Sequence, residues 1–297
     1  MRVTTTQTQR ATLVHLQGNL KRLLTTQTQS ATGRRFENAS DDPAAAADVL
    51  RADTRLAAYR QYTRNLDAAI ARGSAEDRVL GQMATLIDRA SELAIAQASD
   101  SANGETREIA KVEVDQLLRN MLSLGNTRFG EGFLFGGTRA DQAPLTDTPN
   151  GTPPFIADNT TLGDPELEIG DGVTAVPVHN AHQVFRDTDV LTTLRDLSTA
   201  LADDDPVDIR AAIGRLQEVQ TEVQRLTGET GARVNQFEAA RNEVAEATLD
   251  TRVLRSQVAD IDIAEAVANF SQAQTAYQAA LSAASRVINL NITDYLR

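Results

Sequence analysis

The sequence contains no cysteine and no tryptophan, and aromatic residues make up only 4% of its 297 residues. The lack of cysteine excludes disulfide bonds, thiol catalysis and thiolate metal sites together. Wide globular cores usually draw on large rings, whereas narrow seams between helices need few, so we expect long helices packed side by side. No run reaches the roughly 18 apolar residues of a membrane span. Because Thr4–Gln9 is polar where a signal peptide would be apolar, we also expect no cleaved signal.

The charge of the chain is acidic overall and unevenly distributed. The formal net charge is -12 at pH 7, which argues against nucleic acid as a partner. The segment before Glu37 contains six Lys and Arg residues and no acid, whereas residues 140–210 contain fourteen Asp and Glu against three Arg. This asymmetry suggests that the two segments face different surroundings, although a solvated acidic surface after a basic start would give the same pattern.

A strong helix-start signal lies at residues 40–43. Asp42 is a good N-cap because its carboxylate accepts backbone hydrogen bonds, and Pro43 suits the first helical position because it has no N–H to satisfy. After Pro43, apolar residues recur at steps of three and four to about Ala98. The sequence therefore predicts one helix over this whole stretch.

Three further helices are expected. One follows the turn at Asn103-Gly104 and reaches about Asn126, one begins near Asp189, and one begins at Pro206 after its capping Asp205. Two glycines either break this last helix or permit close packing against it: Gly228 and Gly231.

Between these helices the composition changes to proline and glycine. Six of the eight prolines and eight of the seventeen glycines lie between Gly130 and Pro177. Phe133-Leu134-Phe135 predicts a strand. Residues 167–178 predict a β-hairpin, because Asp171-Gly172 suits the positive backbone angles of a tight turn. We therefore expect a small β-rich insertion at residues 131–188.

Both ends of the chain carry apolar residues at alternating steps of three and four. This spacing is a heptad seam, which on one helix must face another helix. The N-terminal stripe lies among many Thr residues, which are poor helix formers, so we expect this arm to need a partner. Together the stripes form a candidate assembly seam that consists of Leu13, Leu16, Leu20, Leu23, Val267, Phe270, Tyr277, Leu281 and Ile288.

These patterns predict a mainly α fold, an elongated rod of long antiparallel helices with terminal coiled-coil arms and a small β-rich insertion. An N-terminal helical arm, residues 1–38, would pair with a C-terminal heptad helix, residues 258–297. Residues 39–130 would form the outgoing half of the rod, residues 131–188 the outer insertion, and residues 189–257 the returning half.

No combination of residues predicts catalysis, so we expect no catalytic residue, no cofactor and no metal site. His179 and His182 stand three apart, which suits metal binding on a helix, but they lie in the Pro- and Gly-rich segment without a third ligand. The glycines of residues 130–136 do not have the dinucleotide-binding spacing. Asp203–Asp205 is explained more simply as the loop before a proline-started helix than as a cation cluster.

Several stretches of the chain carry a family resemblance. They are Gly33–Phe36 with Asn38–Pro43, Arg128–Gly137, Gly231–Asn235, and Asp260–Ala266 with Gln274–Leu281. Together they resemble the flagellins and their relatives at the junction between the flagellar hook and filament. The resemblance covers nearly the whole chain and is weakest in the insertion. Asp-Asp before Pro43, the Phe-Leu-Phe-Gly-Gly stretch and the short insertion favour the junction proteins over flagellin, whereas Asn289–Leu296 departs from the usual ending of the junction proteins.

The resemblance implies a structural, non-enzymatic component of the bacterial flagellum, an adaptor that joins the hook to the filament. It implies export through the flagellar secretion channel and assembly into a ring. The implied partners are copies of the chain itself, the first hook-associated protein, flagellin and a flagellar export chaperone, with no nucleic acid and no membrane. Two alternatives stay open: a short flagellin that forms the filament itself, and a cytosolic coiled-coil scaffold.

Overall fold

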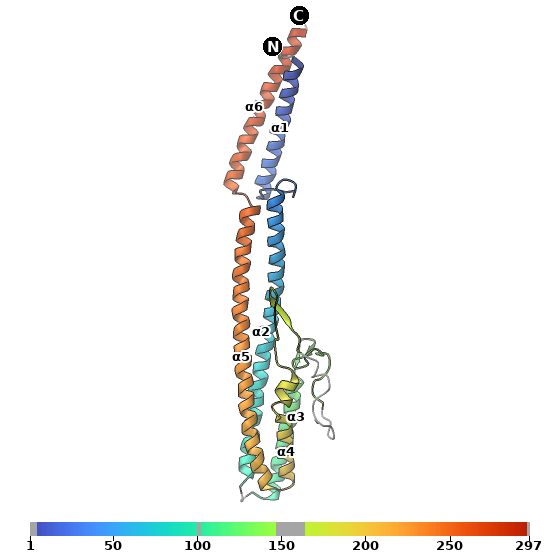
Figure 1. Ribbon diagram of the computed structural model, residues 1–297, viewed down its shortest axis with the longest axis vertical. Helices are drawn as coiled ribbons and strands as arrows, with labels where there is room; N and C mark the ends of the chain where they lie inside the picture. The colour runs from blue at the N-terminus through green and yellow to red at the C-terminus, as the bar shows by residue number, and fades with distance from the viewer. Residues whose placement is uncertain (1–4, 100–101, 147–163, 296–297) are drawn as a thin grey trace. The chain divides into compact units, whose positions relative to one another are not determined.

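The computed structural model describes residues 5–99, 102–146 and 164–295, and most of these residues are helical (Figure 1). The helices are α1 (Thr5–Thr32), α2 (Pro43–Gln97), α3 (Gly104–Gly125), the short π-helix η2 (His182–Arg186), α4 (Val190–Ala202), α5 (Pro206–Ala259) and α6 (Ile263–Tyr295). The strands are β1 (Arg128–Phe129), β2 (Gly132–Phe133), β3 (Leu167–Gly170) and β4 (Val173–Ala175). The predicted class, mainly α with a small β-rich part, is confirmed.

The chain divides into two compact units. The terminal unit contains residues 1–58 and 247–297, and the central unit contains residues 59–246. The long helices α2 and α5 each contribute one part to both units. The terminal unit therefore brings both ends of the chain into one body.

The predicted helix starts are confirmed together with their caps. The Ala45 N–H donates a 3.0 Å hydrogen bond to Asp42 Oδ1 at the start of α2, and Asp205 Oδ1 accepts from Val207 N–H at 2.8 Å at the start of α5. Asn103 caps α3 in the same way, accepting from the Thr106 N–H at 2.9 Å. Local capping chemistry thus fixes where all three helices begin.

The two glycines of α5 neither break the helix nor serve close packing. The helix runs without interruption from Pro206 to Ala259. A Cβ atom added at Gly228 or Gly231 would meet no neighbouring atom within 4 Å. Both positions therefore accept the small helix-propensity cost of glycine without a visible packing reason.

Side chains from α2, α3, α4 and α5 build the core of the central unit. They form one continuous cluster in which Leu80, Met83, Met121 and Leu194 are fully enclosed. At one end of this core, the buried guanidinium of Arg107 donates to the Gln97 carbonyl at 3.2 Å and pairs with Asp204. Arg107 thereby ties the α2–α3 turn to the α4–α5 turn.

The Pro- and Gly-rich segment also supplies core residues. Phe135 and Phe185 are buried, and their rings meet edge to face with centroids 5.5 Å apart. The prediction of a strand over residues 133–135 is wrong beyond Phe133, because Leu134 and Phe135 leave β2 and turn into the core. Leu145 joins them beside Gly125, where an added Cβ would lie 2.1 Å from the Leu145 Cδ1 atom.

The predicted β-hairpin is confirmed as β3–β4. Leu167 pairs with Ala175, and Gly172 adopts a φ of 69° in the turn. Two side chains of α2 hold the hairpin: Tyr62 Oη donates to Glu168 Oε1 at 3.2 Å, and Asn65 Nδ2 donates to the Glu168 carbonyl at 2.6 Å. Burial first, and then the Glu168 carboxylate, raise the pKa of Tyr62.

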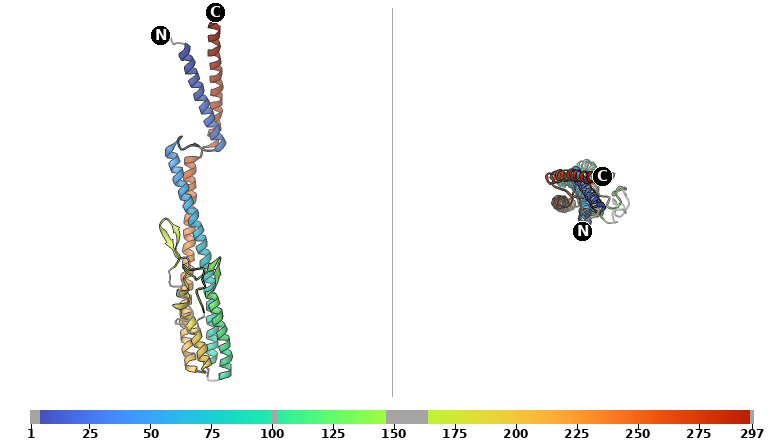
Figure 2. Two further views of the ribbon diagram at one scale, coloured as in Figure 1. Left: turned by 90° about the vertical axis from the view of Figure 1, so that its right-hand side faces the viewer. Right: turned by 90° about the horizontal axis from the view of Figure 1, so that it is seen from above.

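In the terminal unit, α1 and α6 lie side by side and run in opposite directions (Figures 1 and 2). The connection after α1 pairs through its backbone with the connection between α5 and α6: the Arg35 N–H donates to the Ala259 carbonyl at 2.8 Å, and the Ile261 N–H donates to the Gly33 carbonyl at 2.9 Å. This short pairing brings the base of one arm against the base of the other.

Candidate assembly surface

The two arm helices meet along a heptad seam. On α1, the half-buried positions recur at alternating steps of four and three, at Thr12, Leu16, Asn19, Leu23, Thr26 and Ser30. On α6, the enclosed positions follow the same steps, at Ala266, Phe270, Ala273, Tyr277, Ala280 and Ala284. Each helix thus turns one narrow stripe toward the other, as coiled-coil geometry requires.

The predicted seam residues divide between this seam and the outer surface. Leu16, Leu23, Phe270 and Tyr277 lie half-buried in the seam. By contrast, exposed fractions are 53% for Leu13, 39% for Leu20, 50% for Val267 and 50% for Leu281. The side chain of Ile288 lies outside the described residues. Each exposed residue directly follows a seam residue in sequence, and one residue turns an α-helix by about 100°, so these four side chains point to a neighbouring, outward face.

The terminal unit buries small residues and exposes large ones. Among its described residues, those that are fully buried are Ala45, Thr251, Ala259, Ala266, Ala273 and Ala284. Its exposed large apolar residues are Leu13, Val14, Leu20, Leu24, Leu50, Leu249, Val253, Leu254, Ile263, Val267 and Leu281. Large apolar side chains exposed in this number favour association with other surfaces. Seven of these eleven residues are not among the predicted seam residues: Val14, Leu24 and Ile263 lie elsewhere on the arm helices, and Leu50, Leu249, Val253 and Leu254 lie on α2 and α5.

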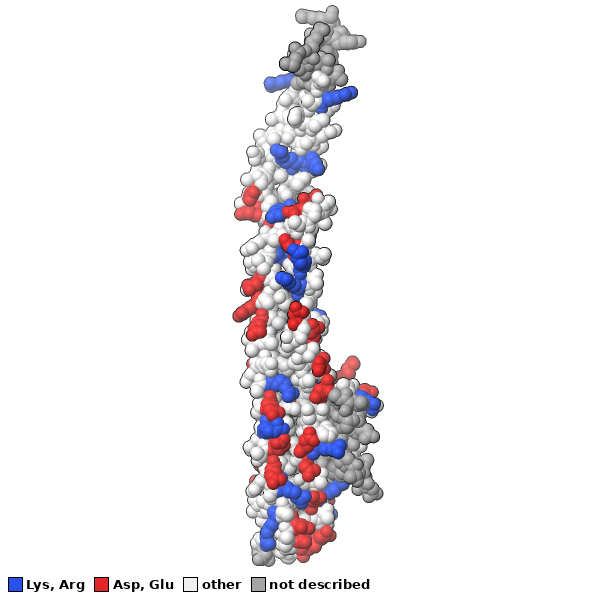
Figure 3. All heavy atoms as spheres, viewed as in Figure 1, with Lys and Arg blue, Asp and Glu red and all other residues white. Residues whose placement is uncertain are grey.

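Charge separates the same two units. The terminal unit contains 12 Lys and Arg residues against 10 Asp and Glu, a net charge of +2, whereas the central unit contains 17 against 31, a net charge of -14. Helix α1 has no acidic residue, and Arg286 is the only charged residue from 266 to 293. Figure 3 shows the resulting surface over α1 and α6, mostly uncharged with separate basic side chains. Copies can therefore approach through the arms without strong repulsion.

A buried polar centre in the central unit contains the first of the two histidines singled out in the sequence. His179 donates its backbone N–H to Glu76 Oε1 at 3.1 Å, and its Nδ1 lies 2.6 Å from the same oxygen. On its other side, His179 Nε2 lies 3.1 Å from Arg233 Nη2 and 3.4 Å from Glu229 Oε2. Arg225, and to a smaller extent His179, holds the pKa of Glu229 below its usual value. This centre joins α2, α5 and the chain after β4.

The second histidine does not join this centre. His182 is the first residue of η2, and its Nδ1 lies 3.1 Å from Oδ1 of Asp187, the residue that follows this short helix. Within the described ranges, no group of three or more potential ligands is arranged to hold a metal ion. Among the helices that the structure describes, none is long and apolar enough to cross a bilayer.

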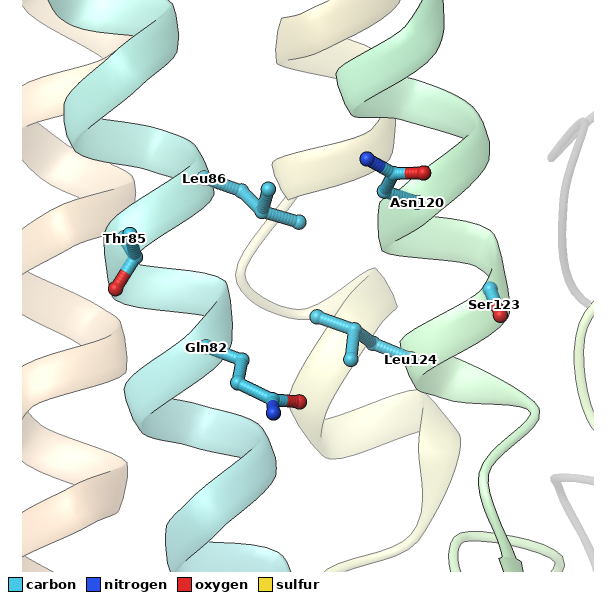
Figure 4. Close-up of a pocket in the computed structure, with 6 residues that line it drawn as sticks. All are labelled: Gln82, Thr85, Leu86, Asn120, Ser123 and Leu124. Atoms are coloured by element: carbon cyan, nitrogen blue, oxygen red, sulfur yellow. The ribbon is translucent and has the colours of Figure 1, made fainter.

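A groove of about 410 Å³ lies between α2 and α3 in the central unit. Figure 4 shows Leu86 reaching into it from α2 and Leu124 from α3. The remaining lining residues are uncharged and polar: Gln82, Thr85, Asn120 and Ser123. This residue set can hold an apolar side chain, but it contains neither a nucleophile with an adjacent base nor an acid–base pair.

Comparison with known proteins defines the class. The model of the bacterial flagellin N-terminal helical region matches residues 3–140, and that of the bacterial flagellin C-terminal helical region matches residues 211–296. The first region contains α1, α2 and α3, and the second contains most of α5 and all of α6. The chain belongs to the bacterial flagellin family.

Within this family, the relatives point to the hook–filament junction. The chain is 25% identical to flagellar hook-associated protein 3 of Escherichia coli over 284 residues, which cover 89% of this chain and 90% of the relative. It is 22% identical to a flagellar filament 30.7 kDa core protein of Treponema maltophilum over 268 residues, 90% of this chain and 86% of that one. Its fold matches that of flagellar hook-associated protein-3 from Legionella pneumophila with a TM-score of 0.60 at 11% identity, covering 71% of this chain and 98% of that one.

Proposed function

We propose that the chain is a structural subunit of the bacterial flagellum that joins the hook to the filament and has no catalytic role. One observation carries the proposal: the terminal unit encloses Ala and Thr while it exposes Leu, Val and Ile. A chain that functioned alone would gain by turning those large side chains inward, since each buried CH₂ is worth about 0.8 kcal/mol. The arrangement suits a subunit whose core is completed by other chains.

The proposed partners are copies of the chain in a ring, the first hook-associated protein on the hook side and flagellin on the filament side. A ring needs a different surface patch on each side of the subunit. The arm pair offers two such patches, one on α1 around Leu13 and Leu20 and one on α6 around Val267 and Leu281. Their similarity in size and chemistry supports packing of one arm pair against the next.

We further propose that the chain is exported through the flagellar secretion channel without a cleaved signal. Before export, the exposed apolar residues of the arms need a cover, because bare apolar patches associate indiscriminately. An export chaperone that binds α6 over Val267 and Leu281 would supply this cover. In the flagellum the same residues would then contact neighbouring subunits.

Aspartate substitution at Leu13 and Leu281 tests the assembly surface. Both side chains are about half exposed, so the changes leave the monomer folded, yet each would place an unpaired charge inside an assembled contact. We expect cells to secrete the double variant and to lose their filaments into the medium. Gln272→Asp, at an exposed position nine residues before Leu281 and therefore on the opposite side of α6, is the control and should retain filaments. Normal filaments from the double variant would contradict the proposal.

Antibody labelling of isolated flagella separates the remaining candidates. Label confined to the hook–filament boundary is the expected result. Label along the whole filament would instead support a short flagellin, the alternative favoured by the similarity to the Treponema filament protein. Protein found only in the cytosol and absent from sheared flagella would support a coiled-coil scaffold.

A further inference from the structure

A groove of about 260 Å³ lies between α2 and α5 within the terminal unit. Ala52 on α2 and Leu254 and Val258 on α5 give it apolar surface, and Leu254 is 59% exposed. An ion pair at 2.6 Å joins the two helices here, between Arg255, which lines the groove, and Asp53, which does not. The described part of the chain therefore leaves Leu254 uncovered on the groove side.

The charged residues of the groove lie at its two edges. At the α2 edge, Asp48 and Arg51 form an ion pair with each other, and Arg55, one turn later, is exposed and unpaired among the described residues. At the α5 edge, Asp250 precedes Leu254 by four residues, so the two lie about 40° apart around the helix. Asp250 is exposed and has no ion-pair partner in the described part of the chain. The α5 edge can therefore bind a cation.

The opposite side of the same helix pair carries an apolar knob and an unpaired cation. Two residues turn a helix by about 200°, so Leu50 points away from Ala52 on α2, and Arg252 points away from Leu254 on α5. Leu50 is 68% exposed. Arg252 is exposed and has no ion-pair partner among the residues that the structure describes. Apart from the paired Asp53, the α2 residues next to Leu50 on this side are small: Ala46, Ala47 and Thr54. A neighbouring helix can therefore approach Leu50 closely.

The knob and the cation lie on one face, close to the level of the groove. Leu50 precedes Asp53 by three residues, which is about 60° around the helix and about 4.5 Å along it. Arg252 precedes Arg255 by the same step on α5. Since the ion pair holds Asp53 and Arg255 together, Leu50 and Arg252 lie on either side of it. Copies placed side by side at the same height thus bring this face of one copy to the groove of the next.

Each of the two faces offers what the other lacks. The knob face, Leu50 with Arg252, presents a large apolar side chain and a positive charge. The groove face, Leu254 with Asp250, presents an apolar hollow and a negative charge. Both faces belong to one chain, whose terminal unit has a net charge of only +2 and does not strongly repel a second copy. The occupant that the chain itself specifies for the groove is therefore another copy.

We propose that Leu50 of one copy enters the α2–α5 groove of the next copy beside Leu254, and that Arg252 pairs there with Asp250. The contact is head to tail, so it can repeat from copy to copy around a ring. Arg55 stays in solvent, because it stands at the edge of the groove away from Leu254. This inference rests on the proposed ring of copies and deepens it, since it adds a contact outside the arm helices and names the residues on both sides.

Cross-linking tests the contact directly, because the chain has no cysteine of its own. In Leu50→Cys/Leu254→Cys, the two thiols of one chain lie on opposite faces, so a disulfide forms only between copies. Mild oxidation of isolated flagella should give a ladder of dimers, trimers and larger species on a non-reducing gel probed with antibody. Leu50→Cys/Val253→Cys is the matched control, since Val253 is 48% exposed but lies about 100° from Leu254. Its ladder should be at least about tenfold weaker, because no contact holds its thiols together.

A charge exchange identifies the ion pair. Added to the Leu50→Cys/Leu254→Cys chain, Arg252→Asp should weaken the ladder at least about fivefold, because it sets two carboxylates against each other across the contact. Adding Asp250→Arg as well restores opposite charges and should return the ladder to within about twofold of its first intensity. Residues two apart on a helix do not face each other, so this rescue requires two copies. Glu238→Arg, at an exposed position elsewhere on α5, restores the net charge alone and should not rescue the ladder.

The same exchange in the cysteine-free chain is scored by filament retention, so the test does not depend on the cysteines: Arg252→Asp should shed filaments and Arg252→Asp/Asp250→Arg should keep them. Circular dichroism checks that every variant keeps its helices. A wild-type chain that is present in flagella, with no stronger ladder than the Val253→Cys control or with filaments indifferent to the exchange, would overturn the contact and leave the proposed function standing. Equal rescue by Glu238→Arg would also overturn it, because net charge would then explain the effect. A wild-type chain absent from flagella would contradict the proposed function and, with it, this inference.

Discussion

The central and terminal units are both helical, yet they place their large side chains on opposite sides. In the central unit, Leu80, Met83, Phe135 and Phe185 are enclosed in one core shared by four helices and the segment between them. In the terminal unit, alanines such as Ala273 occupy the enclosed positions, and most of the exposed Leu, Val and Ile residues of the described chain lie on its surface. One unit completes its core within a single chain, whereas the other leaves large apolar side chains exposed.

The same difference appears in how the two units use charge. The central unit buries Glu76 and His179 as partners, with the half-buried Arg233 beside His179, and keeps a strongly acidic surface. The terminal unit places its ion pairs on the surface, as between Arg255 and Asp53 at 2.6 Å, and is nearly neutral overall. A strongly charged surface keeps copies apart, and a neutral one lets them pack. Charge and packing therefore both support the proposal that copies associate through the terminal unit.

Hydrogen exchange on the free chain tests this comparison most strongly. The only described residues that the α1–α6 seam buries are alanines, its Leu, Phe and Tyr side chains stay half-exposed, and an isolated pair of helices with little buried surface opens readily. Amides from Thr12 to Gln29 should exchange orders of magnitude faster than those from Leu80 to Ala90. In assembled material the first group should become protected. Equal protection of both groups in the monomer would show that the arms are stable without partners.

Alanine substitution of one phenylalanine in each unit compares the cores in energy. Phe185→Ala removes a fully buried ring in edge-to-face contact with Phe135, so it should lower the free energy of unfolding by about 3–5 kcal/mol. Phe270→Ala removes a half-buried ring of the α1–α6 seam and should change the unfolding of the central unit by less than about 0.5 kcal/mol. Urea titration followed by circular dichroism measures both. Similar losses would mean that the arms share the central core's stability.

Much of this architecture follows from local sequence signals. Asp42-Pro43 and Asp205-Pro206 mark helix starts because capping and the proline ring act within one turn. Asp171-Gly172 marks the hairpin because a tight turn needs a positive φ. Each of these signals involves neighbours in sequence, so no knowledge of the tertiary structure is needed to interpret it.

The remaining features depend on contacts that are distant in sequence. Leu134 and Phe135 read as a strand, but the buried positions offered by the helical core outweigh their β propensity. Glu76 and His179 are 103 residues apart, and no sequence pattern near either residue predicts their contact. In the arms, the spacing predicts that a seam exists but not which residues face the partner helix. Leu13 and Leu16 belong to neighbouring rows on the helix surface that are both apolar, and only packing decides which row turns inward. The packing of Phe185 and the contacts of His179 with Glu76 also show that this described part of the segment supports the helices.

The buried polar centre of the central unit and the surface ion pair of the terminal unit should also differ in what they contribute to the free energy of unfolding, by a smaller amount. His179→Leu would keep the backbone N–H of residue 179 on Glu76 Oε1 but remove the imidazole partner of this fully buried side chain, and the loss of one hydrogen bond at a buried polar group costs about 1–3 kcal/mol. Asp53→Ala removes an exposed partner of Arg255 and should cost at most about 1 kcal/mol. Thermal unfolding of each variant at neutral pH provides the measurement. A Glu76→Leu/His179→Leu double variant should recover part of the first loss; no recovery would argue that the two residues act independently.

Acid should loosen the start of α2 in the terminal unit and spare the start of α3 in the central unit. The backbone N–H of Ala45 first, and then the Arg35 guanidinium, hold the pKa of Asp42 below its ordinary value of 3.8. Because the folded-state pKa is the lower one, Asp42 contributes its stabilisation fully above its unfolded pKa, and this contribution disappears as the pH falls through the folded value. Asn103, the cap of α3, has no proton to gain. Amide exchange corrected for its intrinsic pH dependence should therefore show protection of the first turn of α2 falling in acid while that of α3 stays constant.

Asp42→Asn keeps a capping oxygen of similar quality and removes the titration, so its first turn should respond to acid as α3 does. If the wild-type chain and Asp42→Asn lose protection along the same pH curve, another group controls the acid response of this helix.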